Sequence, residues 1–133
     1  MKLFKDRINT FEKVTLHESW MRGVADFEIV CEGEKSTVTR YDIRFTDGED
    51  VRIPDTVVTC RTETVLDVLN ACDLLAWDGF HGKHPKGVLD GTIFRLEATV
   101  NEGETIHADG SQNFPKNYRV LKDWIYDRLR ESK

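Results

Sequence analysis

Apolar and polar residues alternate between residues 94 and 108, with one interruption at Asn101-Glu102-Gly103. An alternation with a period of two predicts two β-strands, each with one buried face. The interruption fits a three-residue hairpin loop, a type I turn followed by Gly103 in the left-handed conformation. The buried face of the predicted hairpin consists of Phe94, Leu96, Ala98, Val100, Ile106 and Ala108.

The length of this loop decides which residues of the two strands face each other. A two-residue loop would set Ala98 opposite His107 and mix buried with exposed positions, which a half-buried hairpin does not tolerate. The three-residue loop avoids this and brings together favourable polar pairs. These pairs are Thr99 with Thr105, Glu97 with His107, and Arg95 with Asp109.

Helical spacing of apolar residues occurs in three places. Intervals of three and four predict a short helix over residues 3–13 and a second helix that begins with Thr62 as its N-cap and ends near Trp77. The third helix follows the hairpin, and Pro115 suits its first turn. Its apolar stripe, which would close over the hairpin, consists of Tyr118, Leu121, Ile125 and Leu129.

Three shorter alternations predict further strands at residues 25–31, 41–45 and 51–53, the last interrupted by Pro54. Strands joined by short turns form antiparallel sheets. The sequence therefore predicts an α+β fold, an antiparallel sheet of about five strands with two or three helices, the C-terminal helix packed on the sheet. Residues 1–133 are expected to form a single domain.

Charge and cysteine content narrow the classes of function. Lys and Arg number 19 and Asp and Glu number 24, and the resulting net charge of −5 argues against nucleic-acid binding. No apolar stretch is long enough to span a membrane. Cys31, Cys60 and Cys72 are an odd number without C-x-x-C spacing, which is typical of reduced thiols. We therefore expect a cytoplasmic protein.

Asp78, His81 and His84 form a local cluster of metal-ligand types in a loop with three glycines, and His107 could join them. They predict, as one alternative, a metal-binding protein or a metal-assisted hydrolase that uses the 78–84 loop. The competing interpretation is a solvated loop whose histidines form local hydrogen bonds. The H-E-x-x-H motif and the calcium-loop pattern are absent, and no cofactor is expected.

Ser111 follows a glycine at a strand-to-helix turn, but its surroundings do not match the G-x-S-x-G pattern of a nucleophile elbow. A turn or capping residue is the better interpretation. Backbone amides near residues 111–116 still predict, as a weaker alternative, anion or small-ligand binding at the start of the last helix.

Aromatic residues lie in two neighbouring loops, the stretch from Trp77 to Pro85 and the turn from Gly110 to Pro115. Exposed loop aromatics are frequent interface anchors, although the same rings can hold a loop on the core. The leading hypothesis is a non-catalytic protein-binding module, with a protein partner or a second copy bound by Trp77, Phe80, Ser111 and Phe114. The polar face of the hairpin is either bare or covered by another subunit.

Three segments, at residues 77–80, 90–96 and 108–118, carry the motifs WDGF, DGTIFRL and ADGSQNFPKNY. These segments resemble those of a family of small bacterial proteins of unknown function, chiefly from Firmicutes. The resemblance implies a bacterial α+β domain and transfers no activity and no catalytic residues.

Overall fold

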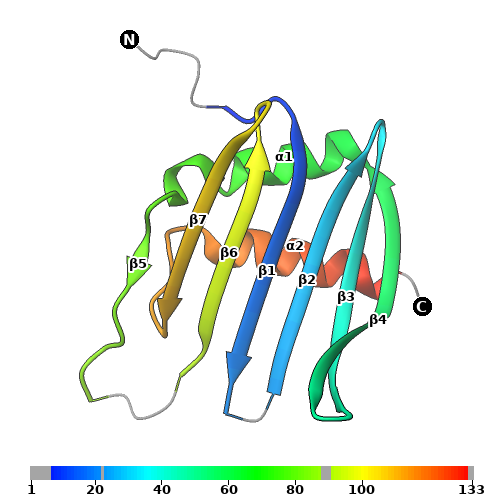
Figure 1. The fold of residues 1–133 in the computed structure, drawn as a ribbon. Coiled ribbons are helices and arrows are strands. Elements are labelled where there is room, and N and C mark those ends of the chain that lie inside the picture. The colour runs from blue at the N-terminus through cyan, green and yellow to red at the C-terminus, as the bar shows by residue number, and fades with distance from the viewer. Residues whose placement is uncertain (1–6, 22, 88–90, 132–133) are drawn as a thin grey trace.

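The computed structural model of the chain describes residues 7–21, 23–87 and 91–131. It contains one seven-stranded sheet and two α-helices that lie on the same face of that sheet (Figure 1). The strands are β1 Phe11–Trp20, β2 Gly23–Glu32, β3 Lys35–Thr46, β4 Glu49–Arg61, β5 His81–Gly82, β6 Ile93–Val100 and β7 Glu104–Ser111. The helices are α1 Thr62–Ala71, the 3-10 helix η1 Leu74–Trp77, and α2 Tyr118–Arg130.

The order of the strands across the sheet is β4-β3-β2-β1-β6-β7-β5. All neighbours are antiparallel except β5 and β7, which run parallel. The predicted α+β class is confirmed, but the sheet has seven strands rather than about five. No helix in the described part of the chain is long and apolar enough to cross a membrane.

The predicted register of the β6–β7 hairpin is confirmed, including Arg95 opposite Asp109 and Glu97 opposite His107. The loop has three residues, but it is not a type I turn, because φ is 44° at Asn101 and 61° at Glu102. The side-chain oxygen of Asn101 accepts a hydrogen bond from the Asn9 amide at 2.8 Å. This loop therefore also holds the segment that leads into β1.

The predicted helix over residues 3–13 is wrong in its described part, because β1 begins at Phe11. The pairing of β1 with β6 shifts by one residue between Phe11 and Lys13, as in a β-bulge. Phe11 and Val14 are therefore both buried although they are three residues apart, a spacing that imitates a helix. Residues 3–6 lie outside the described residues.

The strands predicted at residues 41–45 and 51–53 are the far ends of the longer strands β3 and β4. Pro54 does not end β4, because β4 lies at the edge of the sheet, where a missing N–H need not break a ladder hydrogen bond. The second helix starts at Thr62 as predicted, but Arg61 occupies its N-cap position. The helix ends at Ala71 rather than near Trp77.

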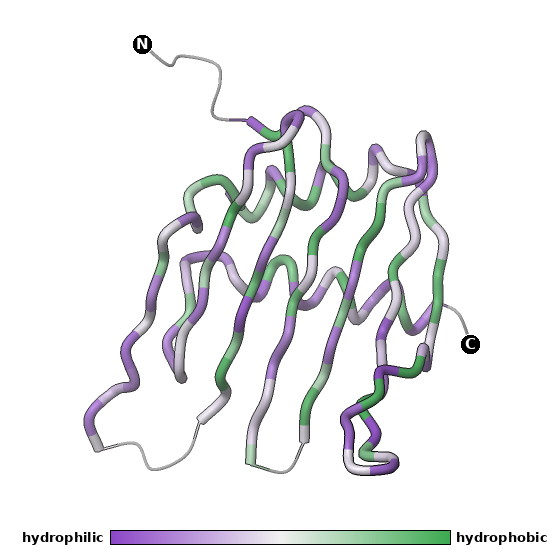
Figure 2. The backbone as a smooth tube through the Cα atoms, viewed as in Figure 1, coloured by the Kyte–Doolittle hydropathy of each residue, from purple (hydrophilic) through white to green (hydrophobic). Residues whose placement is uncertain are grey.

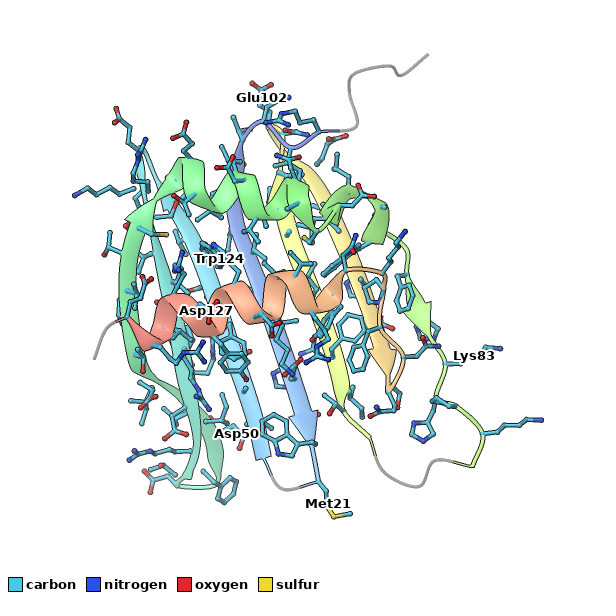
Figure 3. All side chains as sticks on the ribbon, turned by 180° about the vertical axis from the view of Figure 1, so that it is seen from behind. Met21, Asp50, Lys83, Glu102, Trp124 and Asp127 are labelled. Atoms are coloured by element: carbon cyan, nitrogen blue, oxygen red, sulfur yellow. The ribbon has the colours of Figure 1, made fainter. Side chains whose placement is uncertain are left out.

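The hydrophobic core lies between the two α-helices and the face of the sheet that they cover. Along the strands, hydrophobic and hydrophilic residues alternate (Figure 2). Figure 3 shows α1 and α2 lying across the strands on this face, with Trp124 and Asp127 on α2. Each fully buried aliphatic or aromatic side chain contributes roughly 1.5–3 kcal/mol by leaving water. The predicted stripe of α2 is buried at Tyr118, Leu121, Ile125 and Leu129.

One carboxylate is buried on this covered face. Glu18 of β1 is 1% exposed, accepts a hydrogen bond from the Tyr118 hydroxyl, and lies 3.2 Å from Lys122 Nζ. Burial, followed by the nearby carboxylate, raises the pKa of Tyr118. A buried charge needs such partners to be tolerated, so Glu18 ties β1 to the first turns of α2.

Candidate binding surface on the open face of the sheet

The face of the sheet opposite the helices, which we call the open face, carries a continuous line of polar side chains. Cross-strand pairing sets His81 opposite Asp109, Asp109 opposite Arg95, Arg95 opposite His17, His17 opposite Asp26, and Asp26 opposite Tyr41. Paired residues share a face, so one row crosses the six strands from β5 to β3. We call it the polar row: His81, Asp109, Arg95, His17, Asp26 and Tyr41.

The half of the polar row on β1, β2 and β3 is organised by Asp26, which contacts Arg52 and His17. Arg52 Nε lies 2.9 Å from one oxygen of Asp26, and His17 Nδ1 lies 3.2 Å from the other. The Arg52 guanidinium also stacks over the Tyr41 ring, 3.9 Å from its centroid. The Tyr41 hydroxyl donates to Glu28 at 2.9 Å, and this hydrogen bond is the main cause that raises the pKa of Tyr41.

The half of the polar row at the β5–β7 edge is organised by Asp109. One carboxylate oxygen pairs with His81 Nδ1, and the other lies 3.0 Å from His107 Nε2. The hydrogen bond with His81, followed by that with His107, lowers the pKa of Asp109. The other ring nitrogen of His107 lies 3.4 Å from Glu97, the partner predicted from the hairpin register.

Three hollows adjoin one another along this face. The first, of about 380 Å³, and the second, of about 160 Å³, share Thr15 and Glu97. The second and the third, of about 480 Å³, share Arg95. The guanidinium of Arg95 forms no hydrogen bond or ion pair with any residue that the structure describes. Among the described residues, a charged group without a partner therefore lies where two of these hollows meet.

The two segments expected to form a binding surface do meet at this edge. The amide of Asp109 donates to the Phe80 carbonyl at 3.0 Å, and the side-chain amide of Asn113 donates to the Lys83 carbonyl at 3.3 Å. The turn after β7 therefore lies beside the loop that contains β5. Ser111 lies at this junction, where its hydroxyl is 2.8 Å from His84 Nδ1.

The aromatic residues of these segments face inward. Trp77 is 2% exposed, donates its indole N–H to the Lys116 carbonyl at 3.1 Å, and stacks on Tyr118. Phe80 and Phe114 are half-buried and pack against Phe94. Trp77 thus offers almost no surface to a partner, and these rings hold the loop and the turn on the core.

The three metal-ligand candidates do not point toward a common site. Asp78 accepts a hydrogen bond from the His107 amide at 3.0 Å, His81 pairs with Asp109, and His84 contacts Ser111. Within residues 7–21, 23–87 and 91–131, no group of three or more such side chains could hold a metal ion. The arrangement gives the metal alternative no support.

Because a serine beside a histidine can act as a catalytic nucleophile, we asked whether Ser111 also has the backbone amides of an oxyanion hole. An oxyanion hole after a nucleophile elbow uses the amide of the next residue. The amide of Gln112 already donates to the Thr92 carbonyl at 2.7 Å. Ser111 therefore lacks the amide that acyl transfer at this position would need.

Sequence reasoning missed the half of the polar row that lies on β1, β2 and β3. His17 lies in a stretch for which no strand was predicted, and Arg52 of β4 reaches Asp26 of β2 across β3, a contact between strands that are not direct neighbours. The alternation of Thr15 and His17 with the buried Leu16 was the available signal.

Comparisons of this chain with protein-family models, curated proteins and solved structures found no match. We therefore infer the function from the geometry of the open face.

Proposed function

We propose that this chain is a non-catalytic protein-binding module and that the polar row on the open face is its binding surface. The observation that carries the proposal is the row itself, which continues across six neighbouring strands on the face opposite α1 and α2. At a strand spacing of about 4.8 Å, the row is roughly 24 Å long. That length suits a protein surface, because typical interfaces bury about 800 Å² on each partner.

The charges along the row support a protein partner with charges of both signs. Across the sheet, Asp109 and Asp26 alternate with Arg95 and with Arg52, which reaches Asp26 from β4, and a partner that matches this order gains electrostatic complementarity in one register. Arg95 supplies the strongest single contact, since its guanidinium can bind a carboxylate with two hydrogen bonds. The partner is another protein or a second copy of this chain.

The test is affinity purification of the tagged protein from cells that produce it, with mass spectrometry of the proteins that co-purify. The altered protein carries Arg95→Ala and His17→Ala, which remove two neighbouring members of the row. The control carries Arg61→Ala, an exposed arginine that pairs with Glu63 beside α1. We expect a stoichiometric partner with the wild type and with the control, and its loss with the double variant.

Sedimentation of the purified protein covers the case of a second copy, because the double variant should then dissociate a dimer that the control retains. A partner or dimer that survives the double variant would contradict the proposed surface. A wild-type protein that is monomeric and captures nothing would contradict the proposed function.

A further inference from the structure

A separate cavity of about 640 Å³ lies on the helix side of the molecule, at the first turns of α2. Its walls come from Thr92, from the segment Gln112 to Asn117, and from α2 as far as Asp123. Pockets for small molecules usually have volumes of 300–1,000 Å³ and combine apolar walls with a few polar groups. None of the polar row residues line this cavity.

Two neighbouring aromatic rings, tilted by 32° to each other, line one wall. The rings of Phe114 and Tyr118 are 4.7 Å apart, and Phe94 lies behind both, at 5.3 Å from Phe114 and 4.9 Å from Tyr118. This three-ring cluster is fixed by its own packing, and a planar apolar molecule would gain its ring contacts mainly from Phe114, which is half-buried, because Tyr118 is only 5% exposed. Pro115, which is buried, completes the apolar part of the wall.

The backbone that carries this wall has a fixed conformation. Gln112, with φ 50°, and Asn117, with φ 68°, lie at its two ends in the left-handed region that non-glycine residues seldom adopt. Gln112 is held there by two hydrogen bonds to the backbone of Thr92, each 2.7 Å long. The wall therefore exists before a ligand binds, which lowers the entropic cost of binding.

The rim of the cavity carries Arg119, Lys122 and Asp123. Lys122 is engaged with the buried Glu18 at 3.2 Å. The Arg119 guanidinium forms no ion pair with any residue in the described part of the chain, and an exposed Asp123 one turn away would compete with a ligand only weakly. Arg119 is thus the group at this rim that can take a carboxylate with two hydrogen bonds.

We propose that this cavity binds a small aromatic molecule that carries a carboxylate, with its ring against Phe114 and its carboxylate on Arg119. The proposal does not depend on the function of the open face, because the two sites share no lining residue. A molecule of about a dozen non-hydrogen atoms would bind with a dissociation constant of roughly 1 mM.

The test uses indole-3-acetate and phenylacetate as probes and tryptamine and phenethylamine as matched amines of similar shape. Amide chemical shifts in nuclear magnetic resonance spectra report both the affinity and the place of binding. We expect the two acids, and neither amine, to shift amides between residues 112 and 123 and to leave those of the polar row unchanged. Arg119→Gln should weaken binding of the acids by about tenfold or more.

Arg130→Gln is the matched control, because Arg130 lies on α2 at the end away from the cavity and pairs with Asp127. It should bind the acids as the wild type does. Equal binding of acids and amines, or unchanged affinity in Arg119→Gln, would overturn the assignment to a carboxylate. If neither acid shifts these amides at about 10 mM, roughly ten times the expected dissociation constant, the site is not one for aromatic acids.

Discussion

The two faces of the sheet are built from the same strands but differ in chemistry, one being apolar and buried and the other polar and exposed. On the covered face, alternate residues such as Leu16, Phe27 and Leu96 are almost fully buried beneath the helices. On the open face, the residues between them form ion pairs and histidine–carboxylate contacts at the surface. Burial of apolar area provides most of the stability of a fold, whereas exposed ion pairs contribute little. We therefore expect substitutions on the covered face to lower stability and substitutions on the open face to affect binding with little loss of stability.

The largest expected effect is on the covered face, at Trp77. Trp77→Ala should lower the free energy of unfolding by about 3–5 kcal/mol, because it leaves a cavity and removes the stacking on Tyr118. Urea unfolding measures this loss. Phe45→Ala is the control, since Phe45 is 74% exposed and should change stability by less than about 0.5 kcal/mol. Similar losses for the two variants would contradict the burial of Trp77.

The next largest effect is expected at the buried charge. Glu18→Gln should cost about 2–3 kcal/mol, below the range of about 3–5 kcal/mol for a broken buried pair, because Lys122 is partly exposed and can reach water. A double-mutant cycle with Tyr118→Phe measures the coupling. We expect the two losses to add to more than the loss of the double variant. Simple additivity would mean that the two side chains do not interact.

A smaller effect is expected on the open face. Asp26→Asn keeps the shape of the side chain but removes its charge, and it should lower the free energy of unfolding by about 0.5–1 kcal/mol. The effect should shrink further at high salt, because ions screen exposed pairs. Urea unfolding at two salt concentrations measures both quantities. A loss as large as that of Trp77→Ala would show that the open face also carries the fold.

The smallest effect is a dependence on pH at Asp109. Its pKa is lowered in the folded protein, so its contribution to stability is present above the unfolded pKa of about 3.9 and is lost as pH falls through the folded pKa. Wild type and Asp109→Asn should therefore differ in urea midpoint at about pH 6 and converge toward about pH 3. A constant difference across this range would mean that the histidines do not stabilise the carboxylate.

The parts of the fold that local patterns determine could be predicted from the sequence. The register of β6 and β7 follows from a loop of three residues and a period of two, and the stripe of α2 follows from helical spacing. The strand β1 was missed, because its bulge near Phe11 breaks the period at its start and the buried Glu18 puts a charged residue at an apolar position of the alternation that follows. The parallel strand β5 has only two residues, too few for any period to appear.

The candidate site was predicted only in part, for a related reason. Arg95 and Asp109 of the polar row, and the neighbouring pair Glu97 and His107, were predicted to lie together because they belong to one hairpin. His17 joins them through the pairing of β1 with β6, and residues about 80 positions apart leave no local pattern that reveals such a contact. The burial of Trp77 likewise depends on α2 and on the Lys116 carbonyl, which lie far along the chain.

The position of β1 between β2 and β6 has a consequence for synthesis on the ribosome. Strands β1 to β4 have all been made once residue 61 has been added, but the strand that pairs with the other side of β1 ends only at Val100. Until then the nascent meander exposes the edge of β1, and its apolar face still lacks α2, a combination that favours aggregation. The β6–β7 hairpin therefore covers the free edge of β1, and a chain truncated before Val100 is expected to aggregate more readily than the full chain.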